Sequence, residues 1–173
     1  MVVGPRRAAP ASIRIGFWRC GKSTSPLRGR PAVPQRVPYF SYGSNMASAG
    51  MQERCSAPAM LGVATVPGYR FRIATRGYAT LVPDPGSVVH GLLWSLTEGD
   101  LTALDQYEGV PTGEYTRTTI AVPFRGDRLE AQVYLAADPA PGKPRPGYLE
   151  TVIQAARDLG LPHEYIAELE GRT

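Results

Sequence analysis

The stretch Val-Pro-Tyr-Phe-Ser-Tyr-Gly-Ser-Asn at residues 37–45 marks where folded structure begins in this chain. Its β-branched and aromatic residues up to Tyr42 are typical of a strand. The Gly-Ser-Asn at 43–45 then favours a turn, because glycine and short polar side chains interrupt regular structure. We expect a strand at 37–42, a tight turn, and a short helix from about Ala47 to Arg54.

A second informative stretch is Leu-Asp-Gln-Tyr-Glu-Gly at residues 104–109. Thr97 followed by Asp100 is close to a capping box, and apolar residues recur on one face up to Tyr107, which predicts a helix. Glu108 then lies at the negative end of the helix dipole, which raises the pKa expected for it. Both stretches also have an ordinary interpretation, as a tight turn and a solvated helix end.

The remaining pattern consists of short strands and two late helices. Breaks at 67–68 and 83–86 divide the apolar runs, so the expected strands lie at 61–66, 69–74, 79–82, 88–96, 116–123 and 129–135, and the helices at 148–159 and from Pro162. Many short strands with few helices predict an α+β domain, a small mixed and partly closed β-barrel with flanking helices.

Charge is distributed unevenly along the 173 residues. Residues 1–36 hold eight basic and no acidic residues, so the formal charge of +4 combines +8 from this segment with −4 from the rest. We interpret 1–36 as a disordered Pro/Arg-rich tail and 37–173 as one domain. A transit peptide and translated sequence ahead of a misassigned start remain open for the tail. The acidic body does not predict a nucleic-acid surface.

Cysteine use and hydropathy favour a cytoplasmic protein. Cys20 and Cys55 form no disulfide framework, which fits a reducing compartment. No apolar run approaches the roughly 20 residues that span a bilayer, and the first residues lack the apolar stretch of a secretory signal. We expect no membrane partner.

The sequence lacks the residue patterns that nucleotide binding, metal binding and nucleophilic catalysis require. Residues 16–23 match G-x-x-x-x-G-K-S, but the Ser-Thr-Ser-Pro that follows the lysine cannot form the required helix. His90 and His163 stand apart from any ligand cluster, and Ser44 has no partner histidine. We therefore expect no metal and no cofactor.

Taken together and in order, these motifs resemble the γ-glutamylcyclotransferase family. The resemblance rests on eight short stretches, at 39–46, 77–81, 89–96, 104–110, 113–115, 133–135, 146–148 and 160–165. It implies a small mixed α/β barrel with a cavity. It also implies cleavage of γ-glutamyl-amino acids into 5-oxoproline and a free amino acid.

In that chemistry the substrate's own α-amine attacks its γ-carbonyl, so the protein supplies no nucleophile. The resemblance assigns Glu108 as general base and acid. It places the substrate against Tyr39, Phe40, Ser41, Tyr42, Gly43, Ser44, Asn45, Tyr115, Tyr134 and Tyr148. Tyr148 is favoured for a direct hydrogen bond. Glu114, beside Tyr115, is an added acid that could alter the leaving group.

Other functions remain open at this point. Relatives on this fold include γ-glutamylamine cyclotransferases and glutathione-specific enzymes, and a catalytically silent relative would only bind a small ligand. A third possibility is that the basic tail contacts nucleic acid or acidic membranes. We expect a small γ-glutamyl substrate as the partner, no nucleic acid, and a monomer or homodimer.

Overall fold

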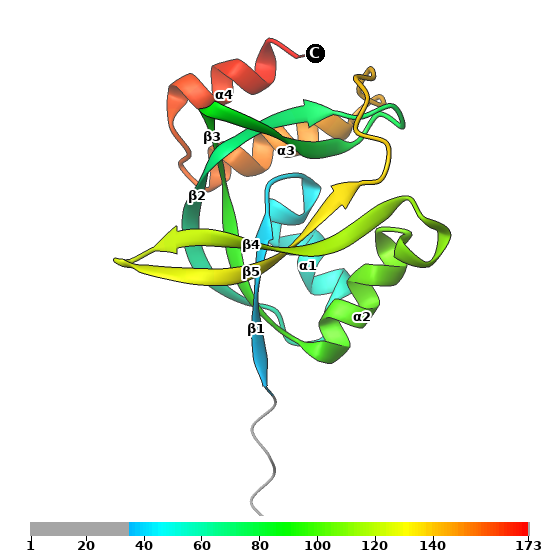
Figure 1. Cartoon of the computed structure of the whole chain (residues 1–173), viewed down its shortest axis with the longest axis vertical. Helices are drawn as coiled ribbons and strands as arrows, with labels where there is room; N and C mark the ends of the chain where they lie inside the picture. Colours follow the sequence, from blue (N-terminus) through cyan, green and yellow to red (C-terminus); the bar gives the residue numbers. More distant parts are fainter. Residues whose placement is uncertain (1–34, 173) are drawn as a thin grey trace, which may run out of the picture. The chain divides into compact units, whose positions relative to one another are not determined.

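A mixed sheet of five strands forms the centre of residues 35–172, the part of the chain that the computed structural model describes (Figure 1). In chain order the strands are β1 (Arg36–Ser41), β2 (Ala59–Ile73), β3 (Ala79–Thr97), β4 (Tyr115–Phe124) and β5 (Asp127–Ala136). They are arranged β2-β3-β1-β5-β4. Because β1 pairs antiparallel with β3 and parallel with β5, the first strand lies in the middle of the sheet.

The predicted tail falls almost entirely outside the described residues. The phosphate-loop-like match at 16–23 lies outside them too. Of the segment 1–36, the structure describes only 35–36, and Arg36 already belongs to β1.

The predicted breaks in the long hairpin were wrong. β2 and β3 pair along most of their length as single strands instead of four short ones. The register shifts at Gly68, between the Pro67–Val88 and Tyr69–Pro83 pairs. Residues 84–87 are extra residues on β3 at this point and form an irregular bulge. Turn-forming residues thus bend this hairpin without ending it, because the flanking ladder supplies the backbone hydrogen bonds.

The expected barrel is open between β2 and β4. Within the described range no ladder joins these edge strands, but side chains connect them. Arg125 Nη2 donates to the Leu61 carbonyl at 3.2 Å, and the Phe124 ring packs beside Gly62. The α+β prediction is confirmed, with a mixed sheet that curves towards a barrel and does not close.

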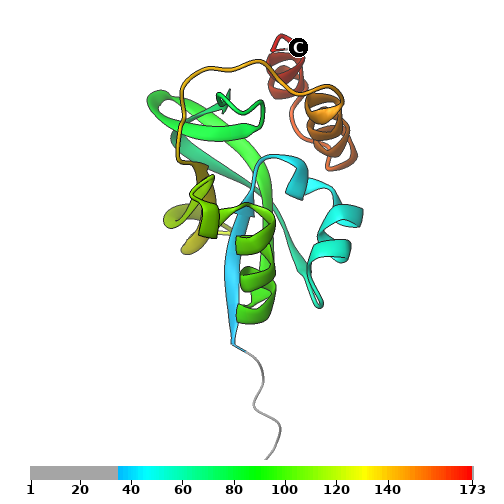
Figure 2. The same cartoon turned by 90° about the vertical axis from the view of Figure 1, so that its right-hand side faces the viewer.

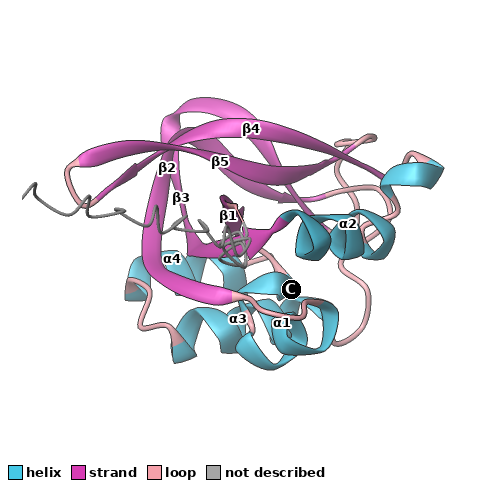
Figure 3. Cartoon of the chain, turned by 90° about the horizontal axis from the view of Figure 1, so that it is seen from below, coloured by secondary structure: helices cyan, strands magenta, loops and turns pink. Residues whose placement is uncertain are grey.

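The helices fall close to their predicted positions. They are α1 (Ser48–Arg54), α2 (Glu98–Tyr107), α3 (Tyr148–Asp158) and α4 (His163–Glu170), with short 3-10 helices η1 (Ser44–Met46) and η2 (Val110–Thr112). Figure 3 shows α1, α3 and α4 on the same side of the sheet. The hydrophobic core includes fully buried side chains such as Trp94, Phe40 and Met51. Within 35–172, no helix is both long and apolar enough to cross a membrane.

The predicted capping box at the start of α2 is confirmed and extends further. Thr97 Oγ1 accepts from the Asp100 amide at 3.1 Å, and Asp100 Oδ2 accepts from the Thr97 amide at 3.0 Å. Asp100 Oδ1 also accepts from the Ser56 amide at 2.7 Å, so this buried carboxylate ties α2 to the α1–β2 turn. Burial raises the pKa of Asp100, but hydrogen bonds from Thr97 and Ser56 outweigh it and lower the pKa to about 2.

We expect Asp100→Ala to lower the free energy of unfolding by about 2–4 kcal/mol at pH 7, because it leaves several buried donors unpaired. Glu98→Gln, an exposed change in the same helical turn, should cost less than about 1 kcal/mol. Urea unfolding measures both. Because the folded pKa lies below the ordinary value, the Asp100 contribution is complete above about pH 4 and is lost as pH falls through 2. A cost at pH 7 no larger than that of Glu98→Gln would contradict this account.

Candidate active site

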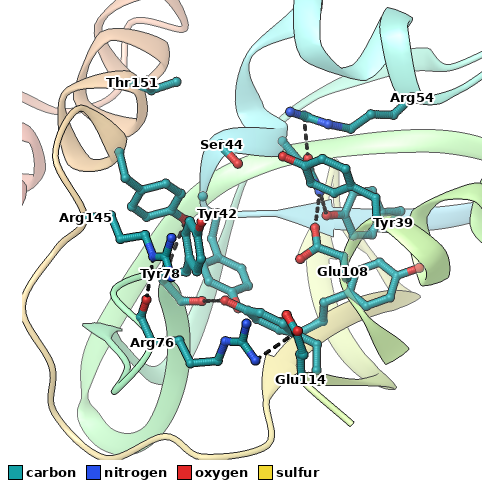
Figure 4. Close-up of a pocket in the computed structure, with 17 residues that line it drawn as sticks. Tyr39, Tyr42, Ser44, Arg54, Arg76, Tyr78, Glu108, Glu114, Arg145 and Thr151 are labelled. Carbon is teal, nitrogen blue, oxygen red and sulfur yellow. Dashed lines mark hydrogen bonds and ion pairs between the residues drawn. The ribbon is translucent and has the colours of Figure 1, made fainter. Parts of the chain in front are cut away.

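A cavity of about 480 Å³ opens where β1 ends, between the start of β3, the end of α2 and the start of α3 (Figure 4). Its size suits a small-molecule ligand. Its walls are mostly aromatic and charged, and the lining residues are Tyr39, Tyr42, Gly43, Ser44, Asn45, Arg54, Arg76, Tyr78, Ala79, Tyr107, Glu108, Glu114, Tyr115, Tyr134, Arg145, Tyr148 and Thr151. The structure therefore brings together most of the predicted site residues.

Glu108 is the carboxylate on one wall of this cavity. It follows the last residue of α2, and its Oε1 accepts from Asn45 Nδ2 at 2.8 Å. Burial raises the pKa of Glu108 to about 7, although the Asn45 hydrogen bond and the Arg54 charge act in the opposite direction. The raised pKa was predicted from the helix end, and in the structure burial is its largest cause. Such a carboxyl can both take and release a proton near neutral pH.

Asn45 is held on all sides. Its Nδ2 donates to Glu108 and to Tyr39 Oη, both at 2.8 Å, and its Oδ1 accepts from Arg54 Nη1 at 2.9 Å. Because a guanidinium can only donate, Arg54 fixes the amide with its NH₂ towards Glu108. Arg54 in turn lies over the Tyr107 ring, 4.0 Å from its centroid. Arg54 was not predicted to have this role, because only the turn of the chain through η1 and α1 brings it back to Asn45.

Two tyrosine hydroxyls are available to a ligand. Tyr39 Oη accepts from Asn45, and Tyr148 Oη accepts from the Ala79 amide at 3.1 Å. None of the residues 35–172 accepts the O–H of either side chain. Burial raises the pKa of Tyr39 well above its ordinary value and that of Tyr148 to about 12, so both stay neutral donors. This arrangement supports the preference for Tyr148 as a direct ligand contact.

Three other lining tyrosines already donate within the protein. Tyr42 donates to the Tyr134 carbonyl at 2.5 Å, and Tyr115 donates to the Ala79 carbonyl at 2.8 Å. Tyr134 donates to Asp105 Oδ1 at 2.8 Å. Their rings form the cavity wall while their hydroxyls join β1, β3, β4, β5 and α2. Tyr115 and Tyr134 are thus placed at the site as predicted, as wall residues.

Two predicted contacts were wrong. Phe40 is fully buried in the core, because side chains alternate along β1 and it points away from Tyr39. Ser41 does not line the cavity, since its hydroxyl donates to the Leu92 carbonyl and accepts from Trp94 Nε1, each at 3.1 Å. Both side chains are buried instead.

Residue 43 must be glycine because a side chain there would collide with Tyr148. The φ of Gly43 is −117°, so the backbone conformation does not itself require glycine. A Cβ at this position would lie 2.8 Å from Tyr148 Oη, closer than carbon and oxygen can approach. Ser44 and Asn45 follow in the short helix η1 and also border the cavity.

The opposite wall carries residues that sequence reasoning did not select. Arg76 and Tyr78, from the turn before β3, face the cavity with Arg145, from the connection that precedes α3 (Figure 4). Glu114 pairs with Arg76, with Oε1 and Nη1 2.9 Å apart. Residues so far apart along the chain share no local pattern. Within the described part of the chain, no group of three or more His, Cys, Asp and Glu side chains could hold a metal ion.

Comparison with known proteins gives the family. The family model described as "Gamma-glutamyl cyclotransferase, AIG2-like" matches residues 39–151, which include the Tyr39–Asn45 strand and turn, Glu108 and Tyr148. The chain belongs to this family.

Relatives of the gamma-glutamyl cyclotransferase, AIG2-like family agree with that assignment. The chain is 29% identical to "Gamma-glutamylcyclotransferase" of Mus musculus and 28% identical to that of Homo sapiens, each over 143 residues covering 76% of both sequences. A solved structure of a "Gamma-glutamyl cyclotransferase" matches with a TM-score of 0.75 at 26% identity, covering 80% of this chain and 89% of that one.

We expect Gly43→Ala to lower the free energy of unfolding by about 1–3 kcal/mol, because the new methyl group meets Tyr148 Oη. In a Tyr148→Phe background, which removes that oxygen, the same change should cost much less. Denaturant unfolding of the four proteins measures this, with Ser44→Ala as a control expected within about 0.5 kcal/mol. Equal costs in the two backgrounds would rule out the proposed clash.

Arg54→Met should raise the pKa of Glu108 above 7, because it removes a positive charge and the group that orients Asn45. Carboxyl-carbon NMR of ¹³C-labelled protein follows this titration, and Glu108→Gln identifies the resonance. Arg128→Met removes an exposed charge at the start of β5 and should leave the pKa unchanged. An unchanged or lower pKa in Arg54→Met would show that Arg54 does not act on Glu108.

Proposed function

We propose that this protein cleaves γ-glutamyl-amino acids into 5-oxoproline and a free amino acid. The observation that carries the proposal is Glu108, a carboxyl with a pKa near 7 held by Asn45 in the wall of a cavity of small-molecule size. The membership of the chain in the gamma-glutamyl cyclotransferase, AIG2-like family supports it.

The reaction needs a proton carrier and no nucleophile from the protein. Deprotonated Glu108 takes a proton from the substrate's α-ammonium group, and the freed amine attacks the γ-carbonyl carbon. A tetrahedral oxyanion forms, protonated Glu108 gives its proton to the leaving nitrogen, and the bond to that nitrogen breaks as the carbonyl re-forms. The attacking nitrogen still carries a second proton, which Glu108 takes and passes to the released amine, so the products are a neutral lactam and an ammonium group. One carboxyl of intermediate pKa performs these transfers, so the protein ends as it began.

The remaining groups are suited to holding the γ-glutamyl part. The backbone amides of 43–45 are proposed to bind its α-carboxylate, with the close approach that Gly43 permits. The O–H groups of Tyr39 and Tyr148 have no acceptor among residues 35–172, so they are candidate donors to the developing oxyanion. Because both phenols are neutral, they donate without placing a second negative charge beside Glu108.

The decisive test is release of 5-oxoproline by the full chain from a panel of substrates. The panel contains a γ-glutamyl dipeptide, the γ-glutamyl-ε-lysine isopeptide and glutathione. Release from the dipeptide supports the proposal. Release from the isopeptide alone would instead assign a γ-glutamylamine cyclotransferase. Binding without release would assign a catalytically silent relative.

Glu108→Gln keeps the shape and hydrogen bonding of the side chain but cannot carry a proton, so we expect kcat to fall by about 10²- to 10⁴-fold. Asp105 is a carboxylate on the same helix that does not line the cavity, so Asp105→Asn should lower kcat far less. In the parent protein, kcat/KM should decrease as pH falls below about 7, because Glu108 becomes protonated and cannot accept the ammonium proton. Near-normal turnover by Glu108→Gln would refute the role of this residue.

A further inference from the structure

One cation on the wall opposite Glu108 has no partner charge. Within residues 35–172, no carboxylate lies within 4.0 Å of the Arg145 guanidinium, whereas neighbouring Arg76 is paired with Glu114. Arg145 Nε donates to the Arg76 carbonyl at 3.2 Å. Its two terminal NH₂ groups have no acceptor in this part of the chain, and together they form the side of the guanidinium that binds carboxylates.

Arg145 is held in place before any ligand arrives. Its amide donates to the Gly77 carbonyl and its own carbonyl accepts from the Tyr148 amide, both at 3.1 Å. Its guanidinium carbon lies 5.1 Å from the centroid of the Tyr78 ring. Contacts to the backbone and to a ring reduce the rotamer entropy that a ligand contact would otherwise cost.

The connection that carries Arg145, residues 137–147, is itself attached to the β2–β3 turn (Figure 2). The Gly142 amide donates to the Ile73 carbonyl at 3.0 Å. Gly77 has a φ of +85°, and a Cβ there would lie 2.9 Å from the Lys143 carbonyl, so only glycine allows this close packing. The position of Arg145 on the cavity wall is therefore set by backbone contacts.

The charges of a dipeptide substrate match this arrangement. A γ-glutamyl-α-amino acid carries one ammonium group and two carboxylates. If its ammonium meets Glu108 and its γ-glutamyl carboxylate meets the 43–45 amides, the second carboxylate, on the leaving amino acid, remains without a partner. Of the two arginines on the side of the cavity away from Glu108, Arg76 is paired with Glu114 and Arg145 has no carboxylate partner within residues 35–172 (Figure 4).

We propose that Arg145 binds the α-carboxylate of the leaving amino acid and thereby selects γ-glutamyl-α-amino acids over γ-glutamylamines that lack this group. The inference rests on the proposed function. The leaving-group carboxylate is remote from the reacting carbonyl and is bound equally before and during reaction. Loss of Arg145 therefore raises KM and changes kcat little.

The test compares γ-glutamyl-alanine with γ-glutamyl-alanine amide, which differ only at the leaving-group carboxylate. The full-length parent protein should prefer the acid. Arg145→Ala should lower kcat/KM for the acid by about 10- to 100-fold, through KM, and change the amide by less than about 3-fold. Arg145→Lys keeps the positive charge but not the bidentate geometry, so its kcat/KM for the acid should lie between those of the parent and Arg145→Ala.

Lys143→Ala is the matched control, because it removes a positive charge from the same connection but does not line the cavity. It should leave both substrates unchanged. Equal losses on acid and amide in Arg145→Ala, or an equal loss in Lys143→Ala, would overturn the proposal. Equal turnover of acid and amide by the parent would also overturn it, while leaving the proposed function intact.

Binding separates this inference from the proposed function. Calorimetry on Glu108→Gln, which should hold both peptides unconverted, gives their Kd values with and without Arg145→Ala. Tighter binding of the acid that disappears with Arg145→Ala supports the carboxylate site, even if the parent releases no 5-oxoproline. Equal Kd values for acid and amide refute it, whatever the turnover.

Discussion

The hydrogen bond between Asn45 and Glu108 is the contact on which the site depends. A carboxylate buried among tyrosines would be strongly destabilised without a donor, and its pKa would rise further than about 7. A direct ion pair with Arg54 would have the opposite effect and hold the carboxyl ionised at every physiological pH. With Asn45 between them, Arg54 orients the donor while its charge stays one side chain away from Glu108. The pKa near neutrality follows from that spacing.

The fold brings the end of β1 and the end of α2 together at this contact. Asn45 follows β1, whose central place in the sheet is fixed by ladders on both sides. Glu108 follows α2, whose start is pinned by Asp100 to the α1–β2 turn. The hydroxyls of Tyr42, Tyr115 and Tyr134 then join the strands and α2 around the cavity. The positions of Asn45 and Glu108 are thus determined by buried contacts on several elements, and no single loop has to place them.

The sequence predicted those parts of the structure that depend on short stretches. The end of β1, the capping box and the position of Glu108 each follow from a few adjacent residues. Phe40 was misplaced because only pairing with β3 shows which side of β1 faces the cavity, and Ser41 because its hydroxyl bonds to Leu92 and Trp94 instead. The β2–β3 hairpin was wrongly predicted as four short strands. The turn-forming residues at 83–86 are instead accommodated as a bulge, because the long partner strand continues past them. Arg54 and Arg145 were not selected, since their roles arise from contacts between separate segments.

The two walls of the cavity differ in what they require of the fold. On the wall that carries Glu108, side chains hold one another through Asn45 and Arg54, so a change at one residue disturbs the others. On the opposite wall, backbone hydrogen bonds from Gly142 to Ile73 and from Arg145 to Gly77 hold the connection in place. Because these bonds do not involve the side chain of residue 145, that side chain can change without loss of the local structure. Under the proposed function, proton transfer by Glu108 and recognition of the leaving group by Arg145 therefore rest on separate walls, and a change at Arg145 alters selectivity without altering the proton carrier.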